Sequence, residues 1–205
     1  MRESREGGAA PREAQERVAL RRVEVVRTYL ALDDPQQLVP PKTVDPRARV
    51  ERRSPCPIPT YRRLYKEVGE KWNWHERAAW TDEKLAAQLA KPGIAVWELM
   101  VGDESAGYFE LERHPDGAVE IVYFGLMEKF IGRGLGGFML ARAAEEGWAM
   151  GAPRVWLHTC TLDSKHALPG YKARGFKEFK RERYYVDFEG DRVLEQHAPH
   201  SSDVL

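Results

Sequence analysis

Residues 120–146 read EIVYFGL-MEKF-IGRGLGG-FMLARAAEE, which is a strand pattern, a short link, a glycine-rich turn and a helix pattern in succession. The first segment predicts a strand because it is rich in β-branched and aromatic residues. The last segment predicts a helix, since Leu135, Phe138, Met139 and Ala143 recur at helical spacing. We therefore expect a tight connection from a strand into the N-terminus of a helix.

The glycine-rich turn predicts an anion-binding site. Its glycines remove the Cβ atoms that would keep a ligand from the backbone, where the first N–H groups of the helix point outward: Gly132, Gly134, Gly136 and Gly137. A P-loop would need Lys followed by Ser or Thr after the glycines, and a dinucleotide fingerprint would need G-x-G-x-x-G. The spacing here is G-x-G-x-G-G, so we expect a phosphate site of another kind.

The turn resembles the pyrophosphate loop of the GNAT superfamily of acyl-coenzyme A-dependent N-acetyltransferases, whose pattern is Q/R-x-x-G-x-G/A. The matching residues run from Ile131 to Gly136, with Ile131 where Gln or Arg is usual, and Arg133 can supply a cation. A second block, ALPGYKARGF at residues 167–176, is similar to the family's A-x-x-x-Y-x-x-x-G-F. The specific motifs span residues 118–176, and the family-like order of elements spans about 22–190.

Composition describes an ordinary globular protein. Of 205 residues, 42% are apolar and 31% are charged, and the 32 basic residues balance the 32 acidic ones, so no global charge favours nucleic acid or an anionic membrane. Apolar runs are shorter than the roughly 20 residues of a membrane helix, and the first residues lack a signal-peptide core, so we expect a cytoplasmic protein. Cys56 and Cys160 form no C-x-x-C, which indicates neither a disulfide framework nor a metal site.

The hydrophobic pattern predicts an α+β fold. Strands are expected at 23–32, 94–101, 106–112, 118–126, 154–161 and 177–188, and helices at 61–69, 81–91, 135–151 and 164–174, the last interrupted by Pro169-Gly170. Prolines between 35 and 59 mark a long connection that cannot be a helix or a central strand. Residues 1–21 are expected to form a tail or extension, 22–190 the domain and 191–205 a C-terminal tail. The order implies a GNAT-like fold, with a central, mostly antiparallel mixed sheet flanked by helices on both faces.

The resemblance implies an N-acetyltransferase that moves an acetyl group from acetyl-CoA to a primary amine of a small molecule or peptide, by direct transfer in a ternary complex. The main chain at the end of the strand is expected to pair with the pantetheine amides, at Phe124, Gly125 and Leu126. Backbone amides of the turn are expected to hold the pyrophosphate, at Ile131, Gly132, Arg133, Gly134, Leu135, Gly136 and Gly137.

Acetyl transfer to an amine needs a base for the amine proton and an acid for the leaving thiolate. Strict alternation places Glu120 on an apolar strand face, which would raise its pKa, and the histone-acetylating branch of the family carries its glutamate on a similar strand. Glu120 is therefore the candidate base, with Glu110, His158 and Asp163 as rivals. Tyr171 stands where the family's tyrosine meets the coenzyme sulfur, so it is the candidate acid.

The acceptor site is expected near Trp72 and Trp74, whose rings would suit an aromatic, aliphatic or amino-acid-like amine, although core packing is the alternative. We expect no nucleic acid, membrane or metal partner, and a homodimer is left open. Two alternatives remain for the function. One is a non-catalytic acyl-CoA-binding regulatory module, which would dispense with Glu120 and Tyr171, and the other is a hydrolase that uses Cys160.

Overall fold

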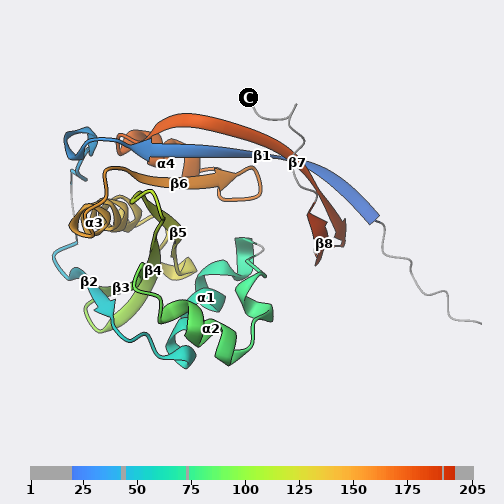
Figure 1. Ribbon diagram of the computed structural model, residues 1–205, viewed down its shortest axis with the longest axis horizontal. Coiled ribbons are helices and arrows are strands. Elements are labelled where there is room, and N and C mark those ends of the chain that lie inside the picture. Colours follow the sequence, from blue (N-terminus) through green and yellow to red (C-terminus); the bar gives the residue numbers. More distant parts are fainter. Residues whose placement is uncertain (1–19, 43–44, 73, 191, 197–205) are drawn as a thin grey trace, which may run out of the picture.

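The computed structural model describes residues 20–42, 45–72, 74–190 and 192–196. In this part of the chain one eight-stranded sheet has the order β2-β3-β4-β5-β6-β1-β7-β8, with helices on both faces (Figure 1). The strands are β1 (Leu20–Leu32), β2 (Ala48–Arg53), β3 (Ile94–Val101), β4 (Glu104–Arg113), β5 (Val119–Leu126), β6 (Val155–Cys160), β7 (Lys177–Glu189) and β8 (Arg192–Gln196). The helices are α1 (Ile58–Gly69), α2 (Asp82–Leu89), α3 (Leu135–Ala149) and α4 (Ala167–Ala173), with short 3-10 turns η1 (Pro35–Gln37), η2 (Glu70–Trp72), η3 (Arg77–Ala79) and η4 (Glu128–Phe130). The predicted α+β fold is confirmed.

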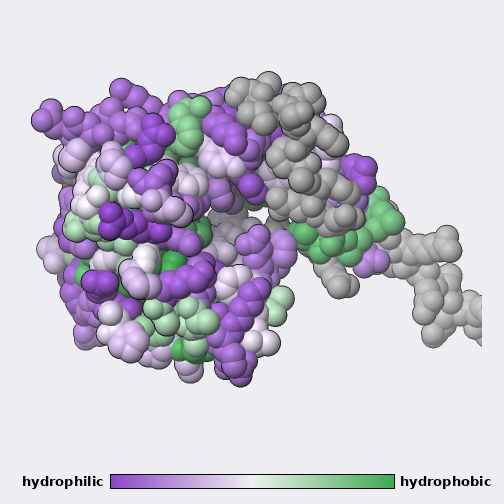
Figure 2. Space-filling view, viewed as in Figure 1, coloured by the Kyte–Doolittle hydropathy of each residue, from purple (hydrophilic) through white to green (hydrophobic). Residues whose placement is uncertain are grey.

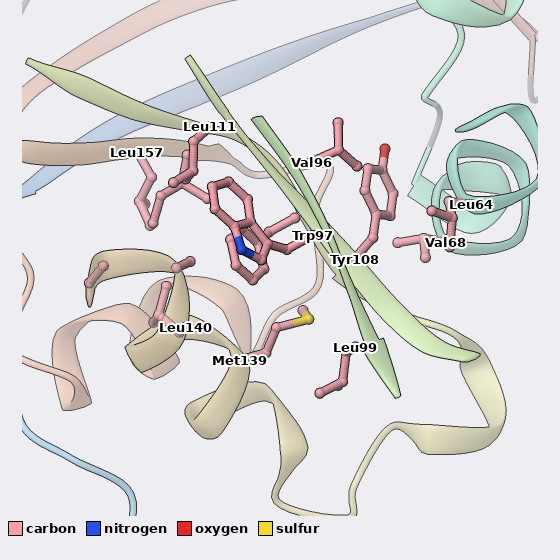
Figure 3. Close-up of a cluster of buried hydrophobic side chains, with 14 of the residues drawn as sticks. Leu64, Val68, Val96, Trp97, Leu99, Tyr108, Leu111, Met139, Leu140 and Leu157 are labelled. Atoms are coloured by element: carbon pink, nitrogen blue, oxygen red, sulfur yellow. The ribbon is translucent and has the colours of Figure 1, made fainter. Parts of the chain in front are cut away.

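The apolar core lies on both faces of the central strands. Figure 3 shows one layer between the sheet and α1, formed by Leu64, Val68, Val96 and Tyr108. It also shows a second layer between the sheet and α3, formed by Trp97, Leu99, Leu111, Met139, Leu140 and Leu157. Alternate residues of β3 and β4 therefore enter opposite layers, which explains why almost every residue of β3 is buried.

The sheet opens between β5 and β6. These two strands pair in parallel, whereas their other neighbours pair antiparallel. Their register covers only Val119 opposite Val155 and Glu120 opposite Trp156. Beyond Glu120 the two strands separate, so the backbone groups of the rest of β5 that face β6 have no strand partner on that side.

Most helices follow the predicted pattern. The residues of α1 that the spacing placed in phase are all buried: Tyr61, Leu64, Tyr65 and Val68. The Thr81 hydroxyl accepts a hydrogen bond from the Lys84 N–H at 3.3 Å and caps α2. The predicted interruption at Pro169-Gly170 is wrong. Helix α4 runs through it because Pro169 lies in the first turn, where its missing N–H has no intrahelical acceptor to lose.

Two strands were not predicted, and both lie at edges of the sheet. Strand β2 falls within the proline-punctuated connection and pairs with β3, so this segment is indeed no central strand. Strand β8 pairs with β7 and falls within the predicted C-terminal tail. An edge strand has one strand partner and a solvated side, so its apolar alternation is weak. The rest of the predicted tails, residues 1–19 and 197–205, lies outside the described residues.

The outer ends of β1 and β7 extend beyond the other strands and form an arm with β8 (Figure 1). A small apolar cluster stabilises it, formed by Val25, Tyr184, Val186 and Phe188. Apolar side chains also reach the surface near β8 (Figure 2), where Leu194 is exposed. No helix in the described part of the chain is long and apolar enough to cross a membrane.

A β-bulge changes the register in the middle of β5. Tyr123 lies opposite Glu110 on β4, and Ile121 lies opposite Leu111, so Val122 has no partner. An extra residue in one strand shifts the side chains that follow it to the other face of the sheet.

The predicted faces of β5 are therefore wrong. Residues that lie opposite each other on neighbouring strands point to the same face. Glu120 lies opposite Glu112 and Tyr123 lies opposite Glu110, and these two β4 residues share a face, so Glu120 and Tyr123 both point to the α1 face. Phe124 and Leu126 point to the α3 face instead. Strict alternation placed Glu120 with Phe124 and Leu126 because nothing in the letters of this strand reveals the bulge.

Candidate active site

A cleft with a volume of about 780 Å³ lies where β5 and β6 separate. Tyr65 and Trp74 line it on the α1 face of the sheet, and Leu140 and Tyr171 line it on the α3 face. Figure 2 shows the surface hollowed between the part that carries α1 and the part that carries β6. Because the cleft passes through the sheet, two molecules can approach each other in it from opposite faces.

The N-terminus of α3 meets this cleft through the glycine-rich turn. Gly134 is the N-cap residue, has φ of +77°, and caps the helix with no side chain. A Cβ at Gly132 or at Gly134 would meet no atom within 4 Å, so the space over the turn is open. Gly134, Gly136 and Gly137 line the cleft. An uncapped helix N-terminus that faces open space fits a pyrophosphate, because its first N–H groups lack acceptors.

The other predicted coenzyme-binding residues divide into two groups. Phe124, Gly125, Leu126 and Ile131 line the cleft, whereas Gly132, Arg133 and Leu135 are not among its lining residues. The Leu135 side chain is buried in the core, so its backbone N–H is the part that can face a ligand. The Arg133 guanidinium lies over the Phe130 ring at 5.1 Å.

Gly125 has a packing role that the sequence did not reveal. A Cβ at this position would collide with the Val68 side chain of α1. The glycine is therefore required for the close approach of α1 to β5, whether or not its main chain also binds a ligand.

Tyr171 lies on α4 with its ring edge-on to Phe124, and the ring centroids are 6.1 Å apart. Among the described residues its hydroxyl makes no hydrogen bond, and it lines the cleft. Burial raises the pKa of the Tyr171 phenol, so the hydroxyl keeps its proton at neutral pH. The predicted acid is thus placed in the cleft with a proton that it can donate.

Glu120 lies at the last paired position of β5 and β6, and its side chain is 11% exposed. Its Oε2 atom is 3.0 Å from Nε2 of His114, and its Oε1 atom is 3.8 Å from Nε2 of His158. Burial raises the pKa of the carboxyl, opposed by the hydrogen bond with His114. His158 lines the cleft, whereas Glu120 is not among the lining residues, so the histidine stands between the carboxylate and the cleft.

The structure gives Glu110, a rival for the base, a structural role. Its side chain is fully buried, accepts a hydrogen bond from the Tyr61 hydroxyl at 2.7 Å, and pairs with Nη1 of Arg77 at 2.6 Å. Glu110 also does not line the cleft. A carboxylate paired in this way with a buried cation is not available to an amine.

Asp163 and Cys160 are also held in place. One oxygen of Asp163 accepts hydrogen bonds from the Thr159 hydroxyl at 2.7 Å and from the Cys160 N–H at 2.8 Å, which fixes the turn after β6. Burial raises the pKa of the Cys160 thiol, so little nucleophilic thiolate is present at neutral pH. His158 is the rival that remains, and burial lowers its pKa, so its imidazole is neutral at pH 7.

Aromatic rings form the α1 side of the cleft. The Trp74 ring contacts Tyr123 and Tyr65, with centroid distances of 5.0 and 5.6 Å, and Gly69 leaves the space that Trp74 fills. Trp72 and Trp74 both line the cleft. A second cavity of about 570 Å³ adjoins it and shares Tyr65 and Trp74.

Sequence reasoning missed three residues of this region. Tyr65 and Tyr123 belong to no motif and follow only the apolar pattern of their helix and strand, and His114 lies in a turn without a motif. Among the described residues no group of three or more His, Cys, Asp or Glu side chains could hold a metal ion.

The chain resembles known proteins over the region that contains both sequence blocks. The sequence profile of the Acetyltransferase (GNAT) family matches residues 59–176, which is more than half of the chain. The chain belongs to the GNAT acetyltransferase family. The matched range contains the glycine-rich turn, both strands beside the cleft and Tyr171.

Three proteins similar to this GNAT chain are distant from it in sequence. A mycothiol acetyltransferase of Corynebacterium efficiens is 30% identical over 127 residues, which cover 58% of this chain and 42% of the relative. The chain thus spans less than half the length of that relative. Two solved structures share the fold. A GCN5-related N-acetyltransferase of Kribbella flavida has a TM-score of 0.56 at 14% identity, covering 91% of this chain and 63% of that one. An aminoglycoside acetyltransferase from an uncultured soil metagenomic sample has a TM-score of 0.55 at 13% identity, covering 77% of this chain and 96% of that one.

Proposed function

We propose that this chain is an N-acetyltransferase that moves an acetyl group from acetyl-CoA to a primary amine of a small molecule or peptide. The observation that carries the proposal is the cleft through the sheet, with the uncapped start of α3 on one side and an aromatic wall on the other. Such a cleft supports direct transfer in a ternary complex, since donor and acceptor can occupy it together.

In this proposal the two faces of the sheet have different ligands. Backbone amides at the start of α3 bind the pyrophosphate, and the main chain of Phe124, Gly125 and Leu126, unpaired with β6, binds the pantetheine amides. The acceptor enters beside Trp72 and Trp74, whose rings exclude water from its carbon skeleton. Acetyl-CoA supplies an activated thioester when it is bound.

The proton transfers are assigned to two side chains. Glu120 takes up the proton of the acceptor ammonium at the base of the cleft. Tyr171 donates its phenolic proton to the leaving thiolate and is reprotonated by the second proton that the nitrogen loses. The amine nitrogen forms its bond to the carbonyl carbon as the carbon–sulfur bond breaks, and no residue of the chain is acetylated. Removal of a proton from the amine is needed because an ammonium group has no lone pair.

Two measurements test this function. Wild-type protein is screened for coenzyme A release from acetyl-CoA with a panel of amines, which includes the acceptor of mycothiol acetyltransferases because of the named relative. Calorimetry then compares acetyl-CoA binding by Gly134→Glu and Gly151→Glu. Both glycines have similar positive φ and open space around them, +77° and +79°, but Gly151 lies at the far end of α3.

Gly134→Glu should abolish binding, because it places a carboxylate where phosphate oxygens would lie, whereas Gly151→Glu should bind as wild type does. Undiminished binding by a folded Gly134→Glu variant would mean that the phosphate site lies elsewhere. Binding by wild type without turnover of any amine would favour a non-catalytic acyl-CoA-binding module instead.

A further inference from the structure

Three ionisable side chains lie in line from the cleft to the surface. His158 comes from β6, Glu120 from β5, and His114 from the turn between β4 and β5. Each carboxylate oxygen of Glu120 faces a different imidazole, at 3.8 Å for His158 and 3.0 Å for His114. The longer distance exceeds that of a hydrogen bond, and rotation about a soft terminal torsion of either side chain can bring the two atoms within hydrogen-bond distance.

The two ends of this line are exposed to solvent, and its middle is largely buried. The His158 side chain is 38% exposed and lines the cleft, and the His114 side chain is 35% exposed at the turn. The Glu120 side chain between them is 11% exposed. A proton that enters at His158 can therefore reach solvent at His114 without passing back through the cleft.

The geometry of the line is held by the surrounding structure. The backbone N–H of His114 donates a hydrogen bond to the Ala118 carbonyl at 2.8 Å, and the His114 ring packs against the Trp156 ring with 5.4 Å between the centroids. The His158 ring is edge-on to Tyr29 at 5.7 Å. Trp156 is also the residue that pairs with Glu120, so the same strand junction positions all three groups.

The partners of Glu120 differ from those of the other buried carboxylates. Glu110 pairs with Arg77, Glu98 pairs with Arg53 and Arg63, and Glu182 pairs with Lys180. Arginine and lysine are charged at neutral pH and neutralise a carboxylate, whereas an imidazole gains and loses its proton near neutral pH. A purely structural carboxylate would not need two partners of this kind.

The environment brings the proton affinities of His158 and Glu120 closer together. Desolvation by the surrounding side chains lowers the pKa of His158, although part of its ring stays exposed, and burial raises the pKa of Glu120, which reduces the free-energy difference for a transfer between them. Other ionisable groups face the line from each neighbouring element, namely Glu112 on β4, Arg27 and Tyr29 on β1, Glu76 of the cleft wall and Asp163 after β6. Glu112 and Arg27 act on Glu120 with opposite signs.

We propose that His158, Glu120 and His114 form a proton relay, in which His158 takes the proton of the acceptor amine and Glu120 and His114 pass it to solvent. This inference rests on the proposed acetyl transfer. An ammonium ion and a thioester become an amide and a thiol, and one net proton is released. The relay carries that proton, so His158 is the catalytic base and the other two are positioning and relay residues.

The test compares rates across pH for variants of the two histidines. The ratio kcat/KM for the amine is measured from about pH 6 to about pH 9 for wild type, His158→Gln, His114→Gln and His166→Gln. His166 also lines the cleft but lies outside the line, so it is the matched control for loss of a cleft histidine.

At the acidic end His158→Gln should lose roughly 100-fold and His114→Gln roughly tenfold, since the carboxylate can still hold the proton when only His114 is absent. Both losses should shrink at the alkaline end, where the amine arrives without its extra proton. His166→Gln should keep the pH profile of wild type. A constant ratio of His158→Gln to wild type at every pH, or a His114→Gln profile equal to wild type, would overturn the relay.

A second readout separates the relay from the function on which it rests. The titration of the His158 ring is followed by NMR in substrate-free wild type and in Glu120→Gln. Loss of the anionic partner should move the His158 midpoint to lower pH, and an unchanged midpoint would show that the two groups are not coupled. Absence of turnover in wild type with every amine would reject the acetyl transfer, whereas a constant ratio in an active enzyme rejects the relay alone.

Discussion

Glu110 and Glu120 lie on neighbouring strands and point to the same face of one sheet, yet their surroundings differ. Glu110 is fully buried and bonded to Arg77 and Tyr61, away from the cleft. Glu120 lies where β5 and β6 separate, is hydrogen-bonded to His114 and faces His158. The role of a buried carboxylate therefore depends on its partner. A permanent cation makes it part of the structure, and a partner that titrates makes it available for proton transfer.

The largest expected effect is on stability, at Glu110. Arg77→Met should lower the free energy of unfolding by about 3–5 kcal/mol, because it leaves a buried carboxylate without its cation. Urea unfolding followed by circular dichroism measures this. Arg142→Met, which removes pairs on the exposed side of α3, is the control and should cost less than about 1 kcal/mol. Equal losses in the two variants would mean that the Arg77–Glu110 pair does not hold the fold.

The second effect is on rate, at the proposed acid Tyr171. Tyr171→Phe should lower kcat by roughly 100-fold and leave acetyl-CoA affinity nearly unchanged, because only a hydroxyl that makes no hydrogen bond within the described structure is removed. Steady-state kinetics and calorimetry measure the two quantities. Tyr185→Phe, at an exposed site of β7, is the control. A kcat equal to that of wild type would exclude Tyr171 from the proton transfer.

The smallest effect is on stability, at Glu120. Its pKa is raised in the folded state, so ionising it costs stability as pH rises from the unfolded pKa of about 4.3 through the folded value. Glu120→Gln should therefore be more stable than wild type at neutral pH, by a margin that disappears at about pH 4. Urea unfolding at the two pH values decides this. A variant that becomes less stable relative to wild type as pH rises would show that the native state favours the ionised carboxyl.

The fold and the strand, turn and helix that border the cleft could be predicted from the sequence, because apolar periodicity and glycine spacing are local signals. The glycine-rich turn precedes α3, and both the turn and Tyr171 line the cleft. The surroundings of Glu120 could not be predicted. The bulge at Val122 depends on the partner strand, and His114 and His158 meet Glu120 through tertiary contacts that join three separate segments.

The pH dependence of Glu120→Gln tests most directly whether Glu120, and not Glu110, receives the amine proton. The variant keeps the size of the side chain but cannot accept a proton, and kcat/KM for the amine is measured for it and for wild type across the pH range in which both stay folded. The ratio of variant to wild type should be lowest at acidic pH, where little amine is free, and should rise toward alkaline pH, where the acceptor arrives deprotonated. A ratio that stays constant with pH would contradict the account, because lost packing lowers the rate by a similar factor at every pH.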